Sequence, residues 1–139
     1  MYSGFYKVPS PTNEPVKSYA PGTPERMEIK AMLQELRSQE IDIPMVIGGK
    51  RIRTENKLRI HPPHEISHTL GYFYQGGAEH VNMAIDAALS VRKRWQVLEW
   101  QDRAAIFLKA ADLISGPYRA KINAATILGQ SKTVHQAEI

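Results

Sequence analysis

Three closely spaced histidines are the side chains in this sequence that could most readily bind a metal. His61, His64 and His68 lie near one another, and Glu65 lies among them. A zinc site needs three or four ligands that converge in a tetrahedron. Pro62-Pro63 separates the first two histidines, which argues against one helix face that carries all three. We therefore interpret them as loop and strand-end residues with ordinary hydrogen bonds.

A second chemical candidate is the segment Gly129-Gln130-Ser131-Lys132-Thr133, which resembles the end of a phosphate-binding loop. The upstream glycine of that motif would fall at or near Ala124, and no predicted strand precedes the segment. The patterns Gly-x-Gly-x-x-Gly and Gly-x-Ser-x-Gly are also absent from the sequence. We interpret the segment as a helix stop followed by a helix cap.

Aromatic and acidic side chains gather around Trp95 and Trp100. Basic residues flank these tryptophans, so the pair could form a binding platform, but such tryptophans more often pack at a helix–helix corner. Glu99, Asp102 and Asp112 could be paired as acid and base, although their spacing does not require it. We expect core tryptophans and solvated carboxylates. The residues themselves therefore identify no catalytic, cofactor-binding or metal-binding position.

Composition excludes several classes of protein. The chain has 139 residues and no cysteine, so it contains no disulfide, cysteine–zinc site or cysteine nucleophile. Hydrophobic residues make up 42% and charged residues 23%, as in ordinary globular domains. No apolar run is long enough to span a membrane. A cytoplasmic protein is the simplest expectation, because the N-terminus lacks the features of a targeting signal.

The net charge of +4 is concentrated in one stretch. Such a patch can attract phosphate or acidic partners. Nucleic-acid binding usually needs a recognisable fold as well, and no such motif is present. We favour a solvated strand surface, since edge strands often carry basic residues. The basic residues between Gly48 and Pro62 are Lys50, Arg51, Arg53, Lys57 and Arg59, against the single acid Glu55.

The first half of the chain predicts an arm, a helix and a small β element. Residues 1–23 are rich in proline and read as an extended arm. A helix is expected over residues 24–40, with Thr23 as its cap and Pro24 in its first turn. Strands follow at 45–47 and 50–53 around a Gly48-Gly49 turn, then at 57–60 and 69–75. We expect a short antiparallel element over residues 44–76.

The second half, residues 79–139, reads as helices. Breaks are expected near Leu98 and at Gly116-Pro117, and Gly129 is expected to end the helix that follows. Thr133 and Gln136 match a capping box, which announces a further helix. Only six residues follow Thr133, so we expect the sequence to be a fragment of a longer reading frame. The predicted class is α+β, with residues 24–139 as one truncated domain portion.

From His80 to Ile139 the sequence resembles the N-terminal part of the aldehyde dehydrogenase superfamily. The matching pattern is alanine-rich spacing before a tryptophan, then an arginine, paired leucines and a glycine-to-lysine turn. These residues are Ala84, Ala87, Ala88, Trp95, Arg103, Leu108, Leu113 and Gly129 to Lys132. Narrower matches point to the branch that oxidises L-glutamate γ-semialdehyde. They are Asn13-Glu14-Pro15, Pro24-Glu25-Arg26, Phe107 to Asp112, Ser115-Gly116-Pro117, and Gly129 to Thr133 with Gln136 to Ile139.

The resemblance implies oxidation of L-glutamate γ-semialdehyde to L-glutamate with NAD⁺, the second step of proline breakdown. It implies a cysteine thiolate nucleophile, a hydride transfer to NAD⁺ and hydrolysis of a thioester. This chain has no cysteine, so the resemblance assigns no catalytic or NAD-binding residue here, and the chain alone is expected to be inactive. It further implies the α/β fold of that family, a homo-oligomer without nucleic acid or membrane, and the mitochondrial matrix in a eukaryotic source.

Two other interpretations remain open. One is a non-catalytic module, such as a split-gene product, that packs on a partner chain. The other is a small basic nucleic-acid binder, supported only by the sequence pI of about 9.4 and the basic stretch. A coding frame that continues past Ile139 to a cysteine favours the enzyme, and an immediate natural stop favours the module. Salt-dependent binding to unrelated DNA would favour the third interpretation.

Overall fold

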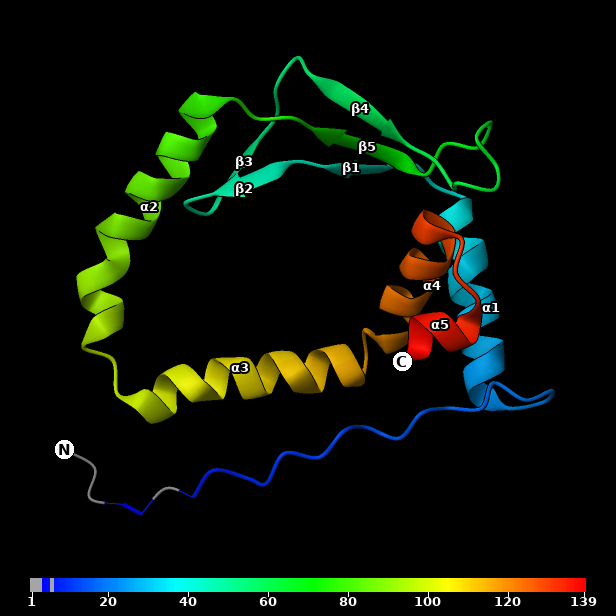
Figure 1. The fold of residues 1–139 in the computed structure, drawn as a ribbon, viewed down its shortest axis with the longest axis horizontal. Helices are drawn as coiled ribbons and strands as arrows, with labels where there is room; N and C mark the ends of the chain where they lie inside the picture. Colours follow the sequence, from blue (N-terminus) through cyan, green and yellow to red (C-terminus); the bar gives the residue numbers. More distant parts are fainter. Residues whose placement is uncertain (1–3, 6) are drawn as a thin grey trace.

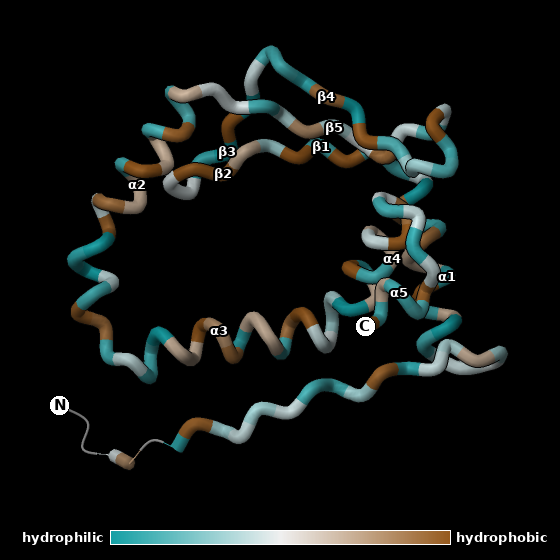
Figure 2. Tube along the Cα trace, viewed as in Figure 1, coloured by the Kyte–Doolittle hydropathy of each residue, from teal (hydrophilic) through white to brown (hydrophobic). Residues whose placement is uncertain are grey.

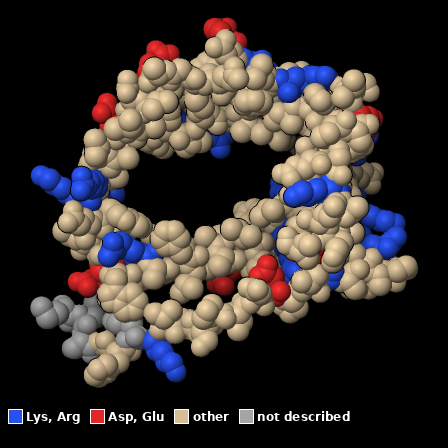
Figure 3. All heavy atoms as spheres, viewed as in Figure 1, with Lys and Arg blue, Asp and Glu red and all other residues tan. Residues whose placement is uncertain are grey.

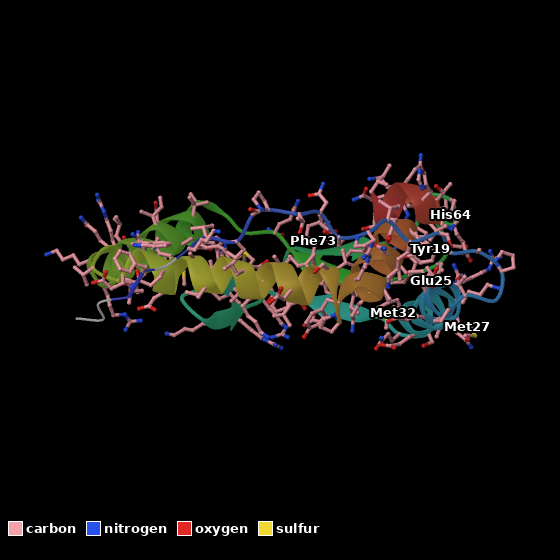
Figure 4. All side chains as sticks on the ribbon, turned by 90° about the horizontal axis from the view of Figure 1, so that it is seen from below. Tyr19, Glu25, Met27, Met32, His64 and Phe73 are labelled. Atoms are coloured by element: carbon pink, nitrogen blue, oxygen red, sulfur yellow. The ribbon has the colours of Figure 1, made fainter. Side chains whose placement is uncertain are left out.

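The helices and strands follow one another around a flat, open ring (Figure 1). The computed structural model describes residues 4, 5 and 7–139, so part of the predicted arm over residues 1–23 lies outside the described residues. An edge-on view shows that the elements form one thin layer (Figure 4). The described part of the arm runs extended beside the ring and leads into the first helix.

Helix α1 spans Pro24–Arg37 and begins where the sequence predicts. Proline suits its first turn because the N–H that proline lacks would have no partner there. Thr23 occupies the predicted N-cap position, but its hydroxyl accepts no N–H from α1 and instead donates to the Ala20 carbonyl oxygen at 2.8 Å. The helix ends at Arg37, short of the predicted residue 40, because the chain turns at Ser38 and enters a strand.

Five short strands form two sheets. The strands are β1 (Ile41–Ile43), β2 (Met45–Ile47), β3 (Lys50–Ile52), β4 (Lys57–Ile60) and β5 (Gly71–Tyr74). Strands β2 and β3 form the predicted antiparallel hairpin. Gly48 and Gly49 make its turn with φ values of +57° and +78°, a conformation that glycine adopts without steric cost.

The other sheet has the order β1-β5-β4, and its β1–β5 pair is parallel. The antiparallel expectation is therefore correct for two of the three pairings, and β1 itself was not predicted. Gly71 allows the close pairing: its φ is +153°, and a Cβ there would lie 2.2 Å from the Ile41 carbonyl oxygen. Local patterns reveal hairpins, but they do not show a parallel partner far along the chain.

Four helices complete the ring: α2 (Ala78–Gln96), α3 (Trp100–Ser115), α4 (Arg119–Gln130) and α5 (Val134–Glu138). The break near Leu98 and the stop at Gly116 are confirmed. The stop at Gly129 is wrong, because α4 continues to Gln130 and Ser131 ends it in the left-handed conformation with φ of 55°. The capping box of α5 is confirmed, since the Gln136 N–H donates to Thr133 Oγ1 at 3.3 Å.

The small hydrophobic core lies at one corner of the ring, where α1, α4 and α5 meet. Tyr19, Ile29 and Ala124 are buried there, with apolar side chains of α1, α4 and α5 around them. Helices α2 and α3 bury no residue in the described structure. Their apolar residues are spread along the tube in Figure 2, and side chains leave the centre of the ring open in Figure 3. None of the described helices is long and apolar enough to cross a membrane.

Candidate functional site

The densest group of polar contacts surrounds the carboxylate of Glu138. Glu138 lies on α5, Arg119 and Asn123 lie on α4, and Tyr19 lies at the end of the arm. Arg119 and Asn123 are four residues apart, so they share one face of α4. The side chain of Glu138 is 0% exposed and that of Arg119 is 11% exposed. The corner that holds the core therefore also holds a buried ion pair.

Every donor around Glu138 points at one of its two oxygens. Oε1 accepts from the backbone N–H of Lys17 at 2.7 Å and from Arg119 Nη2. Oε2 accepts from the Tyr19 hydroxyl at 2.7 Å, from Asn123 Nδ2 at 2.7 Å and from Arg119 Nε at 3.3 Å. The guanidinium thus engages both oxygens, the geometry that makes arginine–carboxylate pairs strong.

These donors determine the ionisation of the cluster. Burial alone would raise the pKa of Glu138, but hydrogen bonds from Arg119, the Lys17 N–H, Tyr19 and Asn123 outweigh it and lower the pKa to about 2. Burial, followed by the hydrogen bond to Glu138, raises the pKa of the Tyr19 hydroxyl. The hydrogen bond to Glu138 raises the pKa of Arg119. The pair is therefore ionised throughout the physiological range.

A carboxylate with these properties is poorly suited to general acid–base work, which needs a pKa near the working pH. What the arrangement does is join the arm to α4 and α5. Nothing in the local pattern indicated this cluster, because Tyr19 and Glu138 are 119 positions apart. Tyr19 lies in an arm rich in proline and Glu138 lies in a short helix, and neither sequence pattern indicates a functional residue.

The three candidate histidines are not assembled into a metal site. No group of three or more metal-ligating side chains occurs within residues 4, 5 and 7–139. His61 Nδ1 lies 3.2 Å from the Pro62 carbonyl oxygen, and His64 Nδ1 lies 2.7 Å from Ser131 Oγ. The position of His64 at one end of the molecule is visible in Figure 4. These two histidines make the ordinary hydrogen bonds that the sequence suggested.

The segment from Gly129 to Thr133 joins α4 to α5: the predicted cap at Thr133 is confirmed, whereas the helix stop falls at Ser131 and not at Gly129. Gly129 lies within α4, Ser131 ends that helix, and Thr133 begins α5. No strand precedes the segment, since the element before it is α4. The geometry is that of a helix–helix connection and not of a phosphate-binding loop.

The two tryptophans lie on either side of the turn between α2 and α3, where the sequence placed a corner. Their expected burial is wrong: Trp95 is 40% exposed and Trp100 is 46% exposed. Trp95 borders a small apolar hollow together with Leu98 and Ile106. Local sequence predicted the corner but not the partial exposure of its tryptophans. Glu99, Asp102 and Asp112 are exposed, as expected.

The cations of the basic stretch mostly make separate contacts with individual partners and do not form one continuous positive patch. Three of its five cations contact a partner among residues 4, 5 and 7–139, which agrees with the strand-surface interpretation. These are Arg53 Nε, which donates to Asp42 Oδ2 at 2.7 Å, Arg59 Nη2, which donates to the Ile66 carbonyl oxygen at 2.8 Å, and Lys57 Nζ, which lies 4.0 Å from the centre of the Tyr72 ring. In Figure 3 side chains of both charges are present around the rim.

Comparison with known proteins identifies the family. The model of the aldehyde dehydrogenase family matches residues 52–139, which include β4, β5 and all four helices of the second half. The chain belongs to the aldehyde dehydrogenase family. The resemblance seen in the order of alanines, tryptophan, arginine and glycine along α2 to α4 is thereby confirmed.

Relatives within this family match nearly the whole length of the chain. The Δ1-pyrroline-5-carboxylate dehydrogenase of Agaricus bisporus is 47% identical over 135 residues, which cover 96% of this chain and 25% of that protein. The mitochondrial enzyme of that name from Homo sapiens is 42% identical and is covered to 23%. The chain therefore spans about a quarter of the length of the relatives that it matches.

Solved structures give the same result. The Δ1-pyrroline-5-carboxylate dehydrogenase from Mycobacterium tuberculosis, solved with NAD bound, superposes with a TM-score of 0.94 at 42% identity. The alignment covers 99% of this chain and 26% of that one. The Thermus enzyme, also with bound NAD, gives a TM-score of 0.85 at 25% identity. The open ring thus reproduces one portion of the aldehyde dehydrogenase fold, which confirms the predicted fold class.

The described residues do not fit a dinucleotide. A dinucleotide fold needs a parallel strand–helix–strand unit with a glycine-rich turn at the helix N-terminus. The one parallel pair here, β1 with β5, is connected through β2, β3 and β4 and not through a helix. Within residues 4, 5 and 7–139, no strand–helix–strand unit of this kind is formed.

Proposed function

We propose that this chain is part of an NAD-dependent dehydrogenase that oxidises L-glutamate γ-semialdehyde, the open form of Δ1-pyrroline-5-carboxylate, to L-glutamate. The observation that carries the proposal is the 47% identity to a Δ1-pyrroline-5-carboxylate dehydrogenase across 96% of the chain. The alignment to this relative extends into the arm and α1, which lie outside the segment matched by the general family model.

The role of this chain in that enzyme is structural. Its most strongly bonded group, Glu138, is saturated with hydrogen bonds and holds the arm to α4 and α5. The chain contains no cysteine, so a thiolate nucleophile would come from a part of the protein outside these residues. Residues 24–139 are proposed to be the portion of the domain on which that remaining part packs, and residues 1–23 the arm that borders it.

The apolar faces of α2 and α3 support this role. Both helices carry partly exposed leucine, isoleucine and tryptophan side chains, α3 adds Phe107, and neither helix buries a residue in the described structure. Contiguous apolar surface of this kind marks a contact with another segment or protein. An enzyme of which this chain is one quarter would provide such a segment.

An assay of NADH formation tests the proposal. The full-length protein that carries this sequence should reduce NAD⁺ with Δ1-pyrroline-5-carboxylate, and residues 1–139 alone should produce no NADH above a no-protein control. Propanal serves as a comparison substrate. Turnover of propanal without turnover of Δ1-pyrroline-5-carboxylate would contradict the substrate, and turnover by residues 1–139 alone would contradict the structural role.

A second candidate function is that of a non-catalytic module on a partner chain, and the same exposed faces of α2 and α3 favour it. Co-purification distinguishes the two. A stable stoichiometric complex with a separate, cysteine-bearing polypeptide would favour the module, whereas one continuous polypeptide with dehydrogenase activity favours the enzyme.

Assembly and compartment follow from the same proposal. We propose a homo-oligomer without nucleic acid or membrane. The mouse and human relatives are named as mitochondrial proteins. By analogy we propose the mitochondrial matrix for a eukaryotic source and the cytoplasm otherwise, which fractionation of the source cells would decide.

A further inference from the structure

We propose that the N-terminal arm is a strap that the carboxylate of Glu138 fastens onto α4 and α5, and that opens about Tyr19. The inference rests on contacts within this chain and does not depend on the substrate of the enzyme. The strap is defined as residues 7–18. Its fastened position is the one in Figure 1, where the arm runs alongside α3.

The fastening consists of bonds to the backbone of the strap. Arg119 Nη2 donates to the Pro15 carbonyl oxygen at 2.7 Å, and Glu138 Oε1 accepts from the Lys17 N–H at 2.7 Å. In an extended chain, backbone groups two residues apart point to the same side. The Arg119–Glu138 ion pair can therefore hold both Pro15 and Lys17. Because it binds their backbone atoms, it fixes the path of the strap independently of the side chains that the strap carries.

Tyr19 is the point at which the strap meets the corner. Its φ of +53° is uncommon for a bulky residue and persists only where the surroundings hold it. Here the Tyr19 hydroxyl donates to Glu138, and Arg26 Nη1 donates to the Tyr19 carbonyl oxygen at 3.1 Å. The side chain lies in the core at 6% exposure. Figure 4 shows Tyr19 beside α4 and α5. A residue held in this way marks the boundary between the fixed corner and the strap.

Beyond the fastening the strap packs loosely. Val8 and Pro9 of the strap and Phe107 and Leu108 of α3 line a hollow of about 660 Å³. A second hollow of about 520 Å³ lies between residues 12–15 and the last turn of α3. Such gaps forfeit much of the dispersion energy of close packing. Within the described residues, the hydrogen bonds that attach the arm to α4 and α5 are those at Pro15, Lys17 and Tyr19, and their loss should therefore release the strap.

Limited trypsin digestion of the full-length protein that carries this sequence tests the strap. Trypsin cuts after Lys17 only when the backbone there is released, whereas a cut after Lys30 reports opening of α1. Glu138→Ala should speed cleavage after Lys17 by about tenfold or more and leave cleavage after Lys30 within about twofold. Glu138→Gln, which keeps the shape and one acceptor oxygen, should give a smaller but clear increase.

The matched control is Glu35→Ala. Glu35 lies on α1 of the same corner, half-exposed, with its Oε1 3.9 Å from Lys121 Nζ. This variant should leave both cleavage rates unchanged. An unchanged Lys17 rate in Glu138→Ala would show that the carboxylate does not hold the strap. Equal acceleration after Lys17 and Lys30 in both Glu138 variants would show that it holds the whole corner, and this too would overturn the proposal.

Discussion

At the scale of single residues, burial determines what an ion pair contributes. Arg119 and Glu138 are almost fully shielded from water, whereas Arg53 and Asp42 keep 49% and 41% of their side chains exposed. Removal of one partner from a buried pair leaves the other charge without compensation. An exposed pair is replaced by water at little cost. The two pairs therefore form a matched comparison within one chain.

Arg119→Ala should lower the free energy of unfolding by about 3–5 kcal/mol, because Glu138 then stays buried without a cation. Arg53→Ala should lower it by about 1 kcal/mol or less. Urea denaturation of the full-length protein, followed by a signal from the corner of α1 and α4, measures both. Equal effects of the two substitutions would contradict the assignment of Arg119 and Glu138 as a buried pair.

The carboxylate of Glu138 also makes the stability of the protein depend on pH, with a definite sign. The pKa of Glu138 falls from an ordinary 4.5 to about 2 on folding. Its stabilisation is therefore complete above pH 4.5 and is lost as the pH falls toward 2, with a size of about 3 kcal/mol. The stability difference between the parent protein and Glu138→Gln should shrink across this window. A difference that is constant from pH 6 to pH 2 would show that the carboxylate is not specifically stabilised.

At the scale of elements, two glycines with different surroundings test the structure of the sheet and of α4. Gly71 joins β5 to β1 with a φ of +153°, and an added Cβ would strike the Ile41 carbonyl oxygen. Gly129 lies in α4 with nothing within 4 Å of an added Cβ. The same substitution should therefore have opposite effects at the two positions.

Gly71→Ala should destabilise the protein by roughly 1–3 kcal/mol, because it forces a strained backbone or separates β1 from β5. Gly129→Ala should stabilise α4 by up to about 1 kcal/mol through helix propensity. Thermal unfolding of both variants beside the parent protein gives the comparison. If Gly71→Ala left the melting temperature unchanged, the parallel pairing of β1 and β5 would be wrong.

At the scale of the whole molecule, the ring has too little core for its size. A chain of this length usually buries about two-thirds of the surface that it exposes when unfolded. Here the buried hydrophobic residues belong to the corner of α1 and α4, except for Leu70 beside β5. The apolar faces of α2 and α3 remain accessible, as an open frame requires.

Isolated residues 1–139 should accordingly bind a dye for apolar surface and self-associate as the concentration rises. The full-length protein, in which we propose that these faces are covered, serves as the control and should bind much less dye per chain. Dye fluorescence and size-exclusion chromatography measure the two properties. A clean monomer with a sharp cooperative melt and no dye binding would contradict this prediction.

Local sequence predicted the helix starts, turns and caps that depend on residues close together in the chain. Proline starts α1, the Gly48-Gly49 pair turns the hairpin, and Thr133 with Gln136 caps α5. Each of these features depends on backbone preferences or on side chains within a few residues. The order of residues along α2 to α4 was also enough to indicate the family, which the family model then confirmed.

Tertiary structure alone decided which distant segments meet. The parallel partner of β1 lies in β5, and the carboxylate that holds Tyr19 lies 119 positions away. The tryptophans at the corner of α2 and α3 are more exposed than their type suggests. Pairing, burial and the low pKa of Glu138 arise from contacts between residues remote in sequence. No local pattern contains the energies of such contacts, because those energies depend on the positions that the folded chain gives to both partners.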